Sequence, residues 1–275
     1  MKSKIKLTTL YFFILIYRLF SDIMSLFNDN LKNIKVKNLA IFIIISYIVL
    51  YILGQFTYLI NQKWIYVFAI LYFVFKLMNY SEDFKNDFSN VFSKVELKFI
   101  LLIVFANIFF SYGMLYAANY LAVSFPSLEL LVNFSIPSMS LVSFAPLIST
   151  IVVSPIAEEL IFRGVLLNRL KMYVPTIFAV LITSLLFGSL HNFGSITSAF
   201  VFAVCMAILY LKTENICVPI LAHFLNNLFA EIIRSVDVNE LLFTDGSVML
   251  VISILAIVSA IILSSSIIKE FNKIK

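Results

Sequence analysis

The sequence is poor in charge. Only 13% of its 275 residues are charged, whereas 62% are hydrophobic, and the mean hydropathy is +1.03. A soluble domain is roughly half apolar and about a quarter charged. The composition therefore excludes an ordinary soluble protein. It predicts an integral membrane protein whose fold is all-α, a polytopic bundle of transmembrane helices.

Cysteine is also scarce, because the chain has only Cys205 and Cys217 and no CxxC. We expect free, packed thiols and neither a disulfide framework nor a zinc knuckle. A P-loop and GxGxxG are absent, which argues against a nucleotide partner. The absence of HExxH, and of a Ser or Cys beside a His, argues against zincin and serine-type chemistry.

The net charge of +5 is spread over short basic clusters between apolar runs. This pattern indicates contact with a lipid bilayer and not with nucleic acid. Lys and Arg concentrate in the segments 30–38, 80–98, 169–173, 212–215 and 269–275, whereas 119–138 and 234–247 carry only Arg234. The positive-inside rule predicts that the first set, and with it the C-terminus, is cytoplasmic in a bacterial plasma membrane.

Most apolar runs approach the ~20 residues that cross a bilayer. We expect seven spans, or eight if residues 8–28 also cross. Residues 1–38 are predicted to be a basic N-terminal segment with an interfacial or extra transmembrane helix, and residues 39–275 a single transmembrane domain. Within it, 80–98 is expected to be a loop with some helix. Residues 139–168 are expected to be an apolar segment broken by Pro146 and Pro155.

Two adjacent carboxylates, Glu158 and Glu159, interrupt a run that otherwise indicates a membrane span. A charge at the centre of a spanning helix costs about 2.5–3.5 kcal/mol, so such a residue is a candidate functional group. Glu159 and Arg163 are four apart on one helix face and can pair, which leaves Glu158 to face a cavity as a general base. A purely structural salt bridge remains the alternative for Glu159 and Arg163.

The only two histidines lie on later segments. Phe187 and His191 are four apart, as are His223 and Asn227, so each pair shares a helix face. Taken alone, each would fit a hydrogen bond that holds helices together or anchors an interface. Together with Glu158, they are the groups that activate water and stabilise an oxyanion. Glu158, His191 and His223 are also a plausible ligand set for zinc or another divalent metal.

The motifs EExxxR at Glu158–Arg163, FxxxH at Phe187–His191 and HxxxN at His223–Asn227 resemble the CPBP family of intramembrane proteases. These CAAX-protease and bacteriocin-processing proteins, also called the Abi family, are related to the type II CAAX prenyl endopeptidase. The resemblance covers about residues 150–230, and it implies hydrolysis of peptide bonds in a membrane-associated peptide or protein.

By this resemblance, Glu158 activates water with the help of His191, and His223 and Asn227 form an oxyanion hole. Glu159 and Arg163 hold the site, and Phe187 lines it. The family is often labelled metalloprotease, although this mechanism needs no metal.

Two rival functions stay open at this stage. One is a non-catalytic membrane protein that gives self-immunity to a bacteriocin or acts as a scaffold. The other is a transporter with Glu158 and His191 as a proton relay, against which the lack of an inverted repeat counts. One geometric difficulty also remains. Counted from the flanking charges, Glu158 and His223 lie about 16 Å deep and His191 about 30 Å, unless the loop 169–176 dips or the spans tilt.

Overall fold

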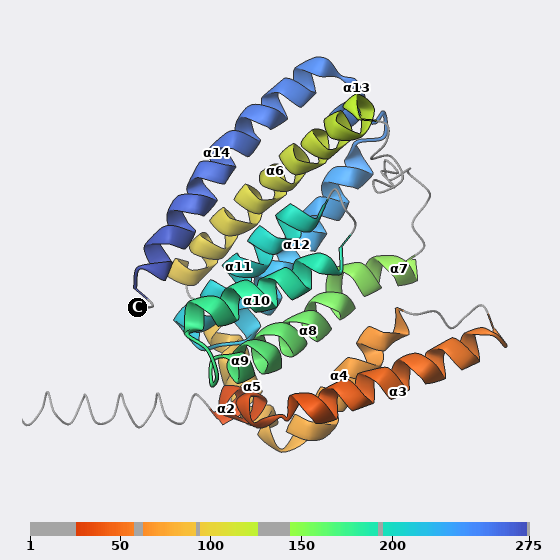
Figure 1. The fold of residues 1–275 in the computed structure, drawn as a ribbon, viewed down its shortest axis with the longest axis vertical. Helices are drawn as coiled ribbons and strands as arrows, with labels where there is room; N and C mark the ends of the chain where they lie inside the picture. The colour runs from red at the N-terminus through yellow and green to blue at the C-terminus, as the bar shows by residue number, and fades with distance from the viewer. Residues whose placement is uncertain (1–25, 58–62, 92–93, 126–143, 192–194, 274–275) are drawn as a thin grey trace, which may run out of the picture.

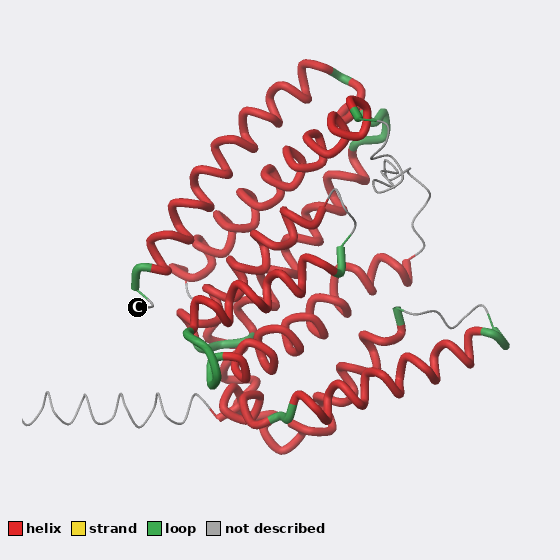
Figure 2. Tube along the Cα trace, in the orientation of Figure 1, coloured by secondary structure: helices red, strands yellow, loops and turns green. Residues whose placement is uncertain are grey.

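The computed structural model describes residues 26–57, 63–91, 94–125, 144–191 and 195–273. Throughout these ranges every regular element is a helix (Figure 2). The predicted all-α fold is therefore confirmed. The expected N-terminal helix at 8–28 and the turn at 192–194 lie largely or wholly outside the described residues.

The chain begins its described part with α2 (Leu26–Asn33), α3 (Val36–Gly54), α4 (Trp64–Leu77), the 3-10 turn η1 (Met78–Tyr80), α5 (Ser81–Val91) and α6 (Lys94–Ser124). A second group follows: α7 (Phe144–Ile148), η3 (Ser149–Val153), α8 (Ser154–Glu159), η4 (Leu160–Leu167) and α9 (Asn168–Leu170). The last group is α10 (Thr176–Ser189), α11 (Ile196–Thr213), α12 (Cys217–Val236), α13 (Leu241–Thr244) and α14 (Gly246–Phe271).

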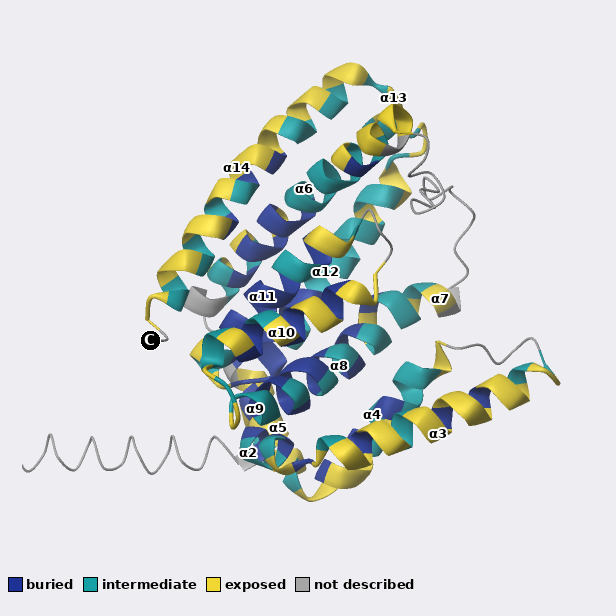
Figure 3. Cartoon of the chain, viewed as in Figure 1, coloured by how far each residue is buried: buried dark blue, intermediate teal, exposed yellow. Residues whose placement is uncertain are grey.

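Helix α11 lies at the centre of the bundle. All residues from Phe202 to Tyr210 are buried, so this helix is covered on every side (Figure 3). A helix that is apolar all round is stable only when other helices or lipid surround it. Helices α6, α10, α12 and α14 pack against α11, and α12 also contacts α5 and α8. The helices that carry the candidate site therefore meet around α11 and α12.

The outer helices expose large apolar side chains. Ile44, Tyr51, Phe75 and Ile257 are each more than half exposed. In lipid such side chains are in their preferred solvent. We therefore treat the surfaces of α3, α4 and α14 as lipid-facing, and the protein as an integral membrane protein.

Five of the described helical segments are long and apolar enough to cross a bilayer: Val36–Gly54, Trp64–Ser89, Leu97–Leu121, Ile196–Thr213 and Gly246–Phe271, while Thr176–Ser189 is apolar but shorter. This is fewer than the seven or eight spans expected. The 20-residue helix α12 is not among the five, since His223, two asparagines, Glu231 and Arg234 interrupt its apolar character. Helix α12, which carries His223 and Asn227, is thus less apolar than the five candidate spans.

The two ends of the bundle match the grouping of loops that the charge pattern predicted. At one end, Lys212 contacts Glu270 at 3.7 Å and lies 4.7 Å from the Phe99 ring centroid. At the opposite end of α6, the Tyr116 hydroxyl donates to the Leu242 carbonyl at 2.6 Å. The basic segments 80–98, 212–215 and 269–275 therefore share one end, and 234–247 lies at the other. Which end faces the cytoplasm stays a prediction.

Residues 80–98 are more ordered than the predicted loop. The segment forms α5 and the start of α6. Asp87 of α5 is buried, accepts from Asn28 Nδ2 at 2.8 Å and, through its backbone carbonyl, accepts from Asn215 at 2.7 Å. One polar residue of the segment, Asp87, therefore links α5 to Asn28 of α2 and to Asn215, just before α12.

The segment from Phe144 to Leu170 is one unbroken run of helical turns, whereas breaks at Pro146 and Pro155 were expected. The turns at Ser149–Val153 and Leu160–Leu167 are π-helical, which accommodates a proline by widening the helix. The side chain of Asn168 then donates to the Arg163 and Gly164 carbonyls of the wide turn, at 3.3 and 3.0 Å. Widening and side-chain capping keep the helix continuous where α-helical bonds are lost.

Helices α6 and α14 lie side by side and pack closely at Gly113 (Figure 1). A Cβ atom at Gly113 would lie 2.5 Å from the Cβ of Ala256. Small residues of this kind let two helix backbones approach within a membrane.

We expect Gly113→Ala to lower the melting temperature of the detergent-solubilised protein. The added methyl group forces the two backbones apart, and overpacking of this kind costs about 1–3 kcal/mol. Gly246→Ala is the matched control, because a Cβ there meets nothing within 4 Å. Equal melting temperatures for the two variants would contradict the close packing of α6 and α14.

Candidate active site

A buried carboxylate, Glu159, lies at the centre of the site. Its Oε1 atom is 2.9 Å from Arg163 Nη1 and 2.8 Å from His223 Nδ1. Glu159 is fully buried, and Arg163 and His223 are nearly so. The predicted pairing of Glu159 with Arg163 is therefore present. The bond to His223 joins α8 to α12 and was not predicted.

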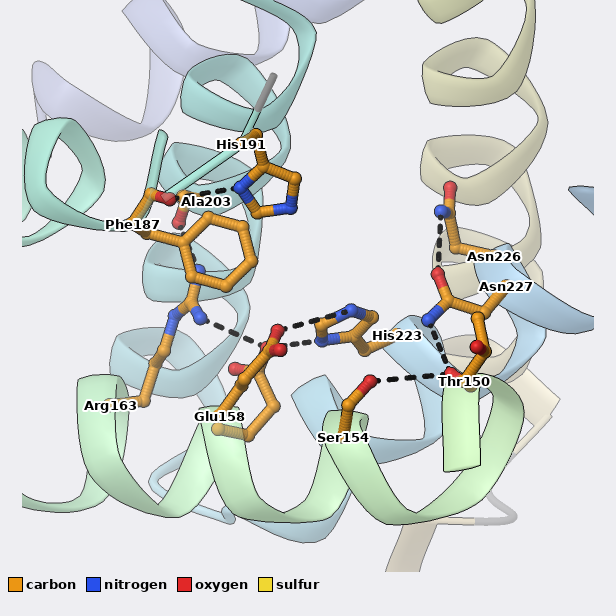
Figure 4. Close-up of polar contacts among 11 residues, drawn as sticks. Thr150, Ser154, Glu158, Arg163, Phe187, His191, Ala203, His223, Asn226 and Asn227 are labelled. Carbon is orange, nitrogen blue, oxygen red and sulfur yellow. Dashed lines mark hydrogen bonds and ion pairs between the residues drawn. The ribbon is translucent and has the colours of Figure 1, made fainter. Parts of the chain in front are cut away.

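Each ring nitrogen of His223 lies near one of the two glutamates. Figure 4 shows the ring facing Glu158. An ionised carboxylate only accepts hydrogen bonds, so His223 Nδ1 donates to Glu159. The other ring nitrogen, Nε2, is 3.8 Å from Glu158 Oε2. A carboxylate on one side of an imidazole fixes its orientation, and the opposite nitrogen is then directed at the reacting groups. Here that nitrogen is directed at Glu158.

Arg163 is fixed by three contacts. Besides Glu159, it donates from Nη2 to the Ala203 carbonyl of α11 at 3.0 Å, and its guanidinium carbon lies 5.0 Å from the Phe187 ring centroid. A guanidinium stacks on aromatic faces and offers several donors in a fixed plane. Arg163 thus connects η4 to α10 and α11. Phe187 is buried against this cation and also packs 6.0 Å from the His223 ring, centroid to centroid.

Asn227 is positioned by the wide turn at η3. In a π-helix each backbone N–H bonds the carbonyl five residues earlier, as Ser154 N–H bonds the Ser149 carbonyl here. By the same pattern, the N–H group that would bond the Thr150 carbonyl belongs to residue 155, which is a proline. Proline has no N–H. The Thr150 carbonyl instead accepts from Asn227 Nδ2 at 2.8 Å and from the Ser154 hydroxyl at 3.4 Å. Pro155 therefore creates the anchor for the asparagine of the third motif.

His191 follows the end of α10, and its ring is held by its own helix. Its Nδ1 is 3.0 Å from the Phe187 carbonyl, which can only accept, so Nδ1 carries a proton and Nε2 is the acceptor. The ring packs 4.9 Å from Phe187, centroid to centroid.

The difficulty over the depth of His191 is resolved by the length of α10. Residues 171–175 form a turn, and α10 has only 14 residues, about 21 Å at 1.5 Å per residue. Figure 1 also shows α10 inclined to α6 and α14. His191 consequently reaches the same cavity as His223 and Asn227.

That cavity has a volume of about 220 Å³. Its walls come from α6, α10, α11 and α12, and they include both histidines, Phe187, Asn227 and Asn226. Asn226 donates to Asn227 Oδ1 at 3.4 Å. A polar cavity of this size holds several waters at about 30 Å³ each.

Three further residues lie at the candidate active site that the sequence did not predict. Tyr66 of α4 faces the Glu158 carboxylate closely enough to interact electrostatically. Thr150 acts through its carbonyl, and Asn107 of α6 lines the cavity. Asn107 could have been recognised from the sequence, since it is a lone amide in an apolar run. Thr150 and Tyr66 could not, because their roles depend on the π turn and on the packing of α4.

The arrangement of the side chains shows whether the candidate active site fits a metal ion. Within the described ranges, no group of three His, Cys, Asp or Glu side chains is arranged to hold a metal ion. Glu158, His191 and His223 do not form such a group. These residues do not fit a three-ligand site, and we derive no step through a metal.

Comparison with known proteins identifies the segment that carries these residues. Residues 140–229 match the family model "Type II CAAX prenyl endopeptidase Rce1-like". An 84-residue stretch, 30% of the chain, is 36% identical to the Bacillus subtilis (strain 168) protein named "Putative membrane peptidase YdiL". The chain covers about a third (34%) of that relative's length. No solved structure matches the chain.

The matched segment contains all three motifs, from Glu158 to Asn227, and the structure joins them through Glu159 and His223. The part of the chain that holds the candidate active site, residues 140–229, is therefore similar in sequence to the Rce1-like type II CAAX prenyl endopeptidases.

Proposed function

We propose that this protein is an intramembrane endopeptidase that hydrolyses peptide bonds with a water molecule activated by Glu158. The observation that carries the proposal is the position of His223, between Glu158 and Glu159 and beside the cavity that His191 and Asn227 line. The family match of residues 140–229 supports the same reaction class.

Glu158 is the general base of the proposed reaction. Its side chain keeps 14% exposure, whereas that of Glu159 is fully buried and engaged by two partners. Glu158 takes a proton as the water oxygen attacks the carbonyl carbon, and it later gives that proton to the departing amine. His191 Nε2 is an acceptor, which suits it to orient the water through a second hydrogen bond.

Oxyanion stabilisation is assigned to His223 and Asn227. Because His223 donates Nδ1–H to Glu159, its Nε2 can donate to the developing negative charge when the ring carries a second proton. An amide has two N–H groups, and the Thr150 carbonyl uses one of those on Asn227. The second is available to the oxyanion. Donors held in advance in this way lose little free energy to reorganisation.

The substrate class follows from the location of the site. The catalytic groups lie among lipid-facing helices, so a membrane-associated peptide or protein segment is the substrate that reaches them. The polar cavity, which the exposed residue His191 borders, gives water a route to His223 and Asn227. Glu158 Oε2 lies 3.8 Å from His223 Nε2, next to this lining.

Glu158→Gln is expected to abolish cleavage. The amide cannot accept the proton of water, and loss of a general base lowers the rate about 10²–10⁴-fold. The assay is hydrolysis of a library of 20-residue apolar peptides, with a farnesylated CAAX peptide included, in liposomes that contain purified protein. Glu82→Gln is the matched control, since Glu82 is an exposed residue paired with Lys85. Full activity in Glu158→Gln would refute the assignment.

Chelation is expected to leave cleavage unchanged, because the proposed chemistry uses only protein groups. The same assay is run after treatment with EDTA and after addition of zinc. Loss of activity with EDTA, followed by recovery with zinc, would replace the glutamate–histidine mechanism with a metal-dependent one.

Glu159→Ala is expected to destabilise the protein. It leaves Arg163 charged and buried, and breaking a buried pair in this way costs about 3–5 kcal/mol. Thermal unfolding of Glu159→Ala, Arg163→Ala and the double variant measures the coupling. The double variant should be less destabilised than the sum of the single variants, by about 0.5–3 kcal/mol. Strict additivity would show that the two side chains do not stabilise each other.

A further inference from the structure

Asn107 is a buried amide for which the described part of the chain supplies no hydrogen-bond partner. Its side chain is on α6, the residue is only 3% exposed, and both Nδ2 and Oδ1 are unsatisfied. Buried polar groups are nearly always paired, and an unpaired one is unfavourable in a membrane interior. An amide in this state indicates a partner that comes from outside the fold.

The position of Asn107 shows where that partner lies. Asn107 lines the cavity that His191 and His223 also line. One turn further along α6, Ser111 lines the same cavity and contacts Ser198 of α11 at 3.3 Å between hydroxyl oxygens. The two residues share one helix face, so α6 presents a short polar stripe to the candidate active site.

The stripe continues toward the end of the bundle that carries α13. A second cavity, about 210 Å³, is lined by residues of α6, α12 and α13 and reaches Arg234. Ser111 and Asn226 line both cavities. The two cavities therefore adjoin at these two residues, and most of the lining of the second cavity is apolar.

We propose that Asn107 is a substrate-binding residue that pairs with the peptide backbone beside the scissile bond. This inference rests on the endopeptidase function proposed above. A side-chain amide carries one carbonyl acceptor and an NH₂ donor, which complement the N–H and C=O groups of a peptide. A substrate in the cavity satisfies both orphan atoms at once, and it does so whatever its side chains are.

The test compares Asn107→Leu and Asn107→Ala with the wild type, using the peptide that is cleaved best in the library. Each variant should lower kcat/KM at least about tenfold, mainly through a higher KM, with an unchanged or higher melting temperature. A residue needed only for folding would instead lower the melting temperature. Two substituents of different size keep the test valid if one misfolds.

Ser184→Ala is the matched control. Ser184 Oγ is also buried and without a partner among the described residues, but Ser184 does not line the cavity. Its kcat/KM should stay within about twofold of the wild-type value. A loss as large as that of the Asn107 variants would show that removing any buried polar group impairs the enzyme, and would overturn the proposal.

A binding measurement separates this inference from the proposed function. The dansylated peptide Leu-Ala-Leu-Ala-Leu-Ala is titrated into Glu158→Gln and into Glu158→Gln with Asn107→Leu. A Kd at least about tenfold weaker in the double variant supports backbone binding, even if the wild type cleaves nothing and the endopeptidase function fails. Equal Kd values overturn the role of Asn107, even if Glu158 proves catalytic.

Discussion

The carboxylate of Glu159 is the contact on which the rest of the site depends. It is fully buried and binds Arg163 on its own helical segment and His223 on α12. Arg163 in turn donates to α11 and stacks on Phe187 of α10. One negative charge thus holds four helical segments in register. In a low-dielectric interior such a charge is stable only when it is paired, so the helices must meet in this arrangement.

This arrangement separates the roles of two neighbouring residues. Glu159 has a structural role, whereas the side chain of Glu158 keeps some solvent exposure and is directed at His223. Adjacent residues on a helix diverge by about 100°, so the two carboxylates point in different directions, Glu159 into the packing and Glu158 toward His223, which lines the cavity. The same division occurs at the asparagines, since Asn227 is anchored to Thr150 and Asn226 borders both cavities.

Stability and chemistry compete within the same helices. The lipid-facing helices α3 and α14 are apolar enough to cross a bilayer, whereas α12, which carries His223 and Asn227, is not among the segments of that kind. Most polar groups of the site are accommodated by pairing with one another and by π-helical turns, which release backbone carbonyls for side chains to bind. Asn107 of α6 differs from them, because neither polar atom of its side chain has a partner among the described residues.

The sequence by itself determined the all-α membrane class, from its low charge and apolar runs. From helical spacing and the resemblance to a protease family, it also predicted the set Glu158, His191, His223 and Asn227, which stays a prediction. Local spacing is enough for Glu159 and Arg163, since residues four apart meet on any helix. Only the tertiary structure decided that Glu159 also binds His223, that His191 reaches the same cavity and that Asn107 faces it. Those contacts join residues distant in sequence, and they depend on helix packing and on turn geometry around Pro155, which periodicity does not encode.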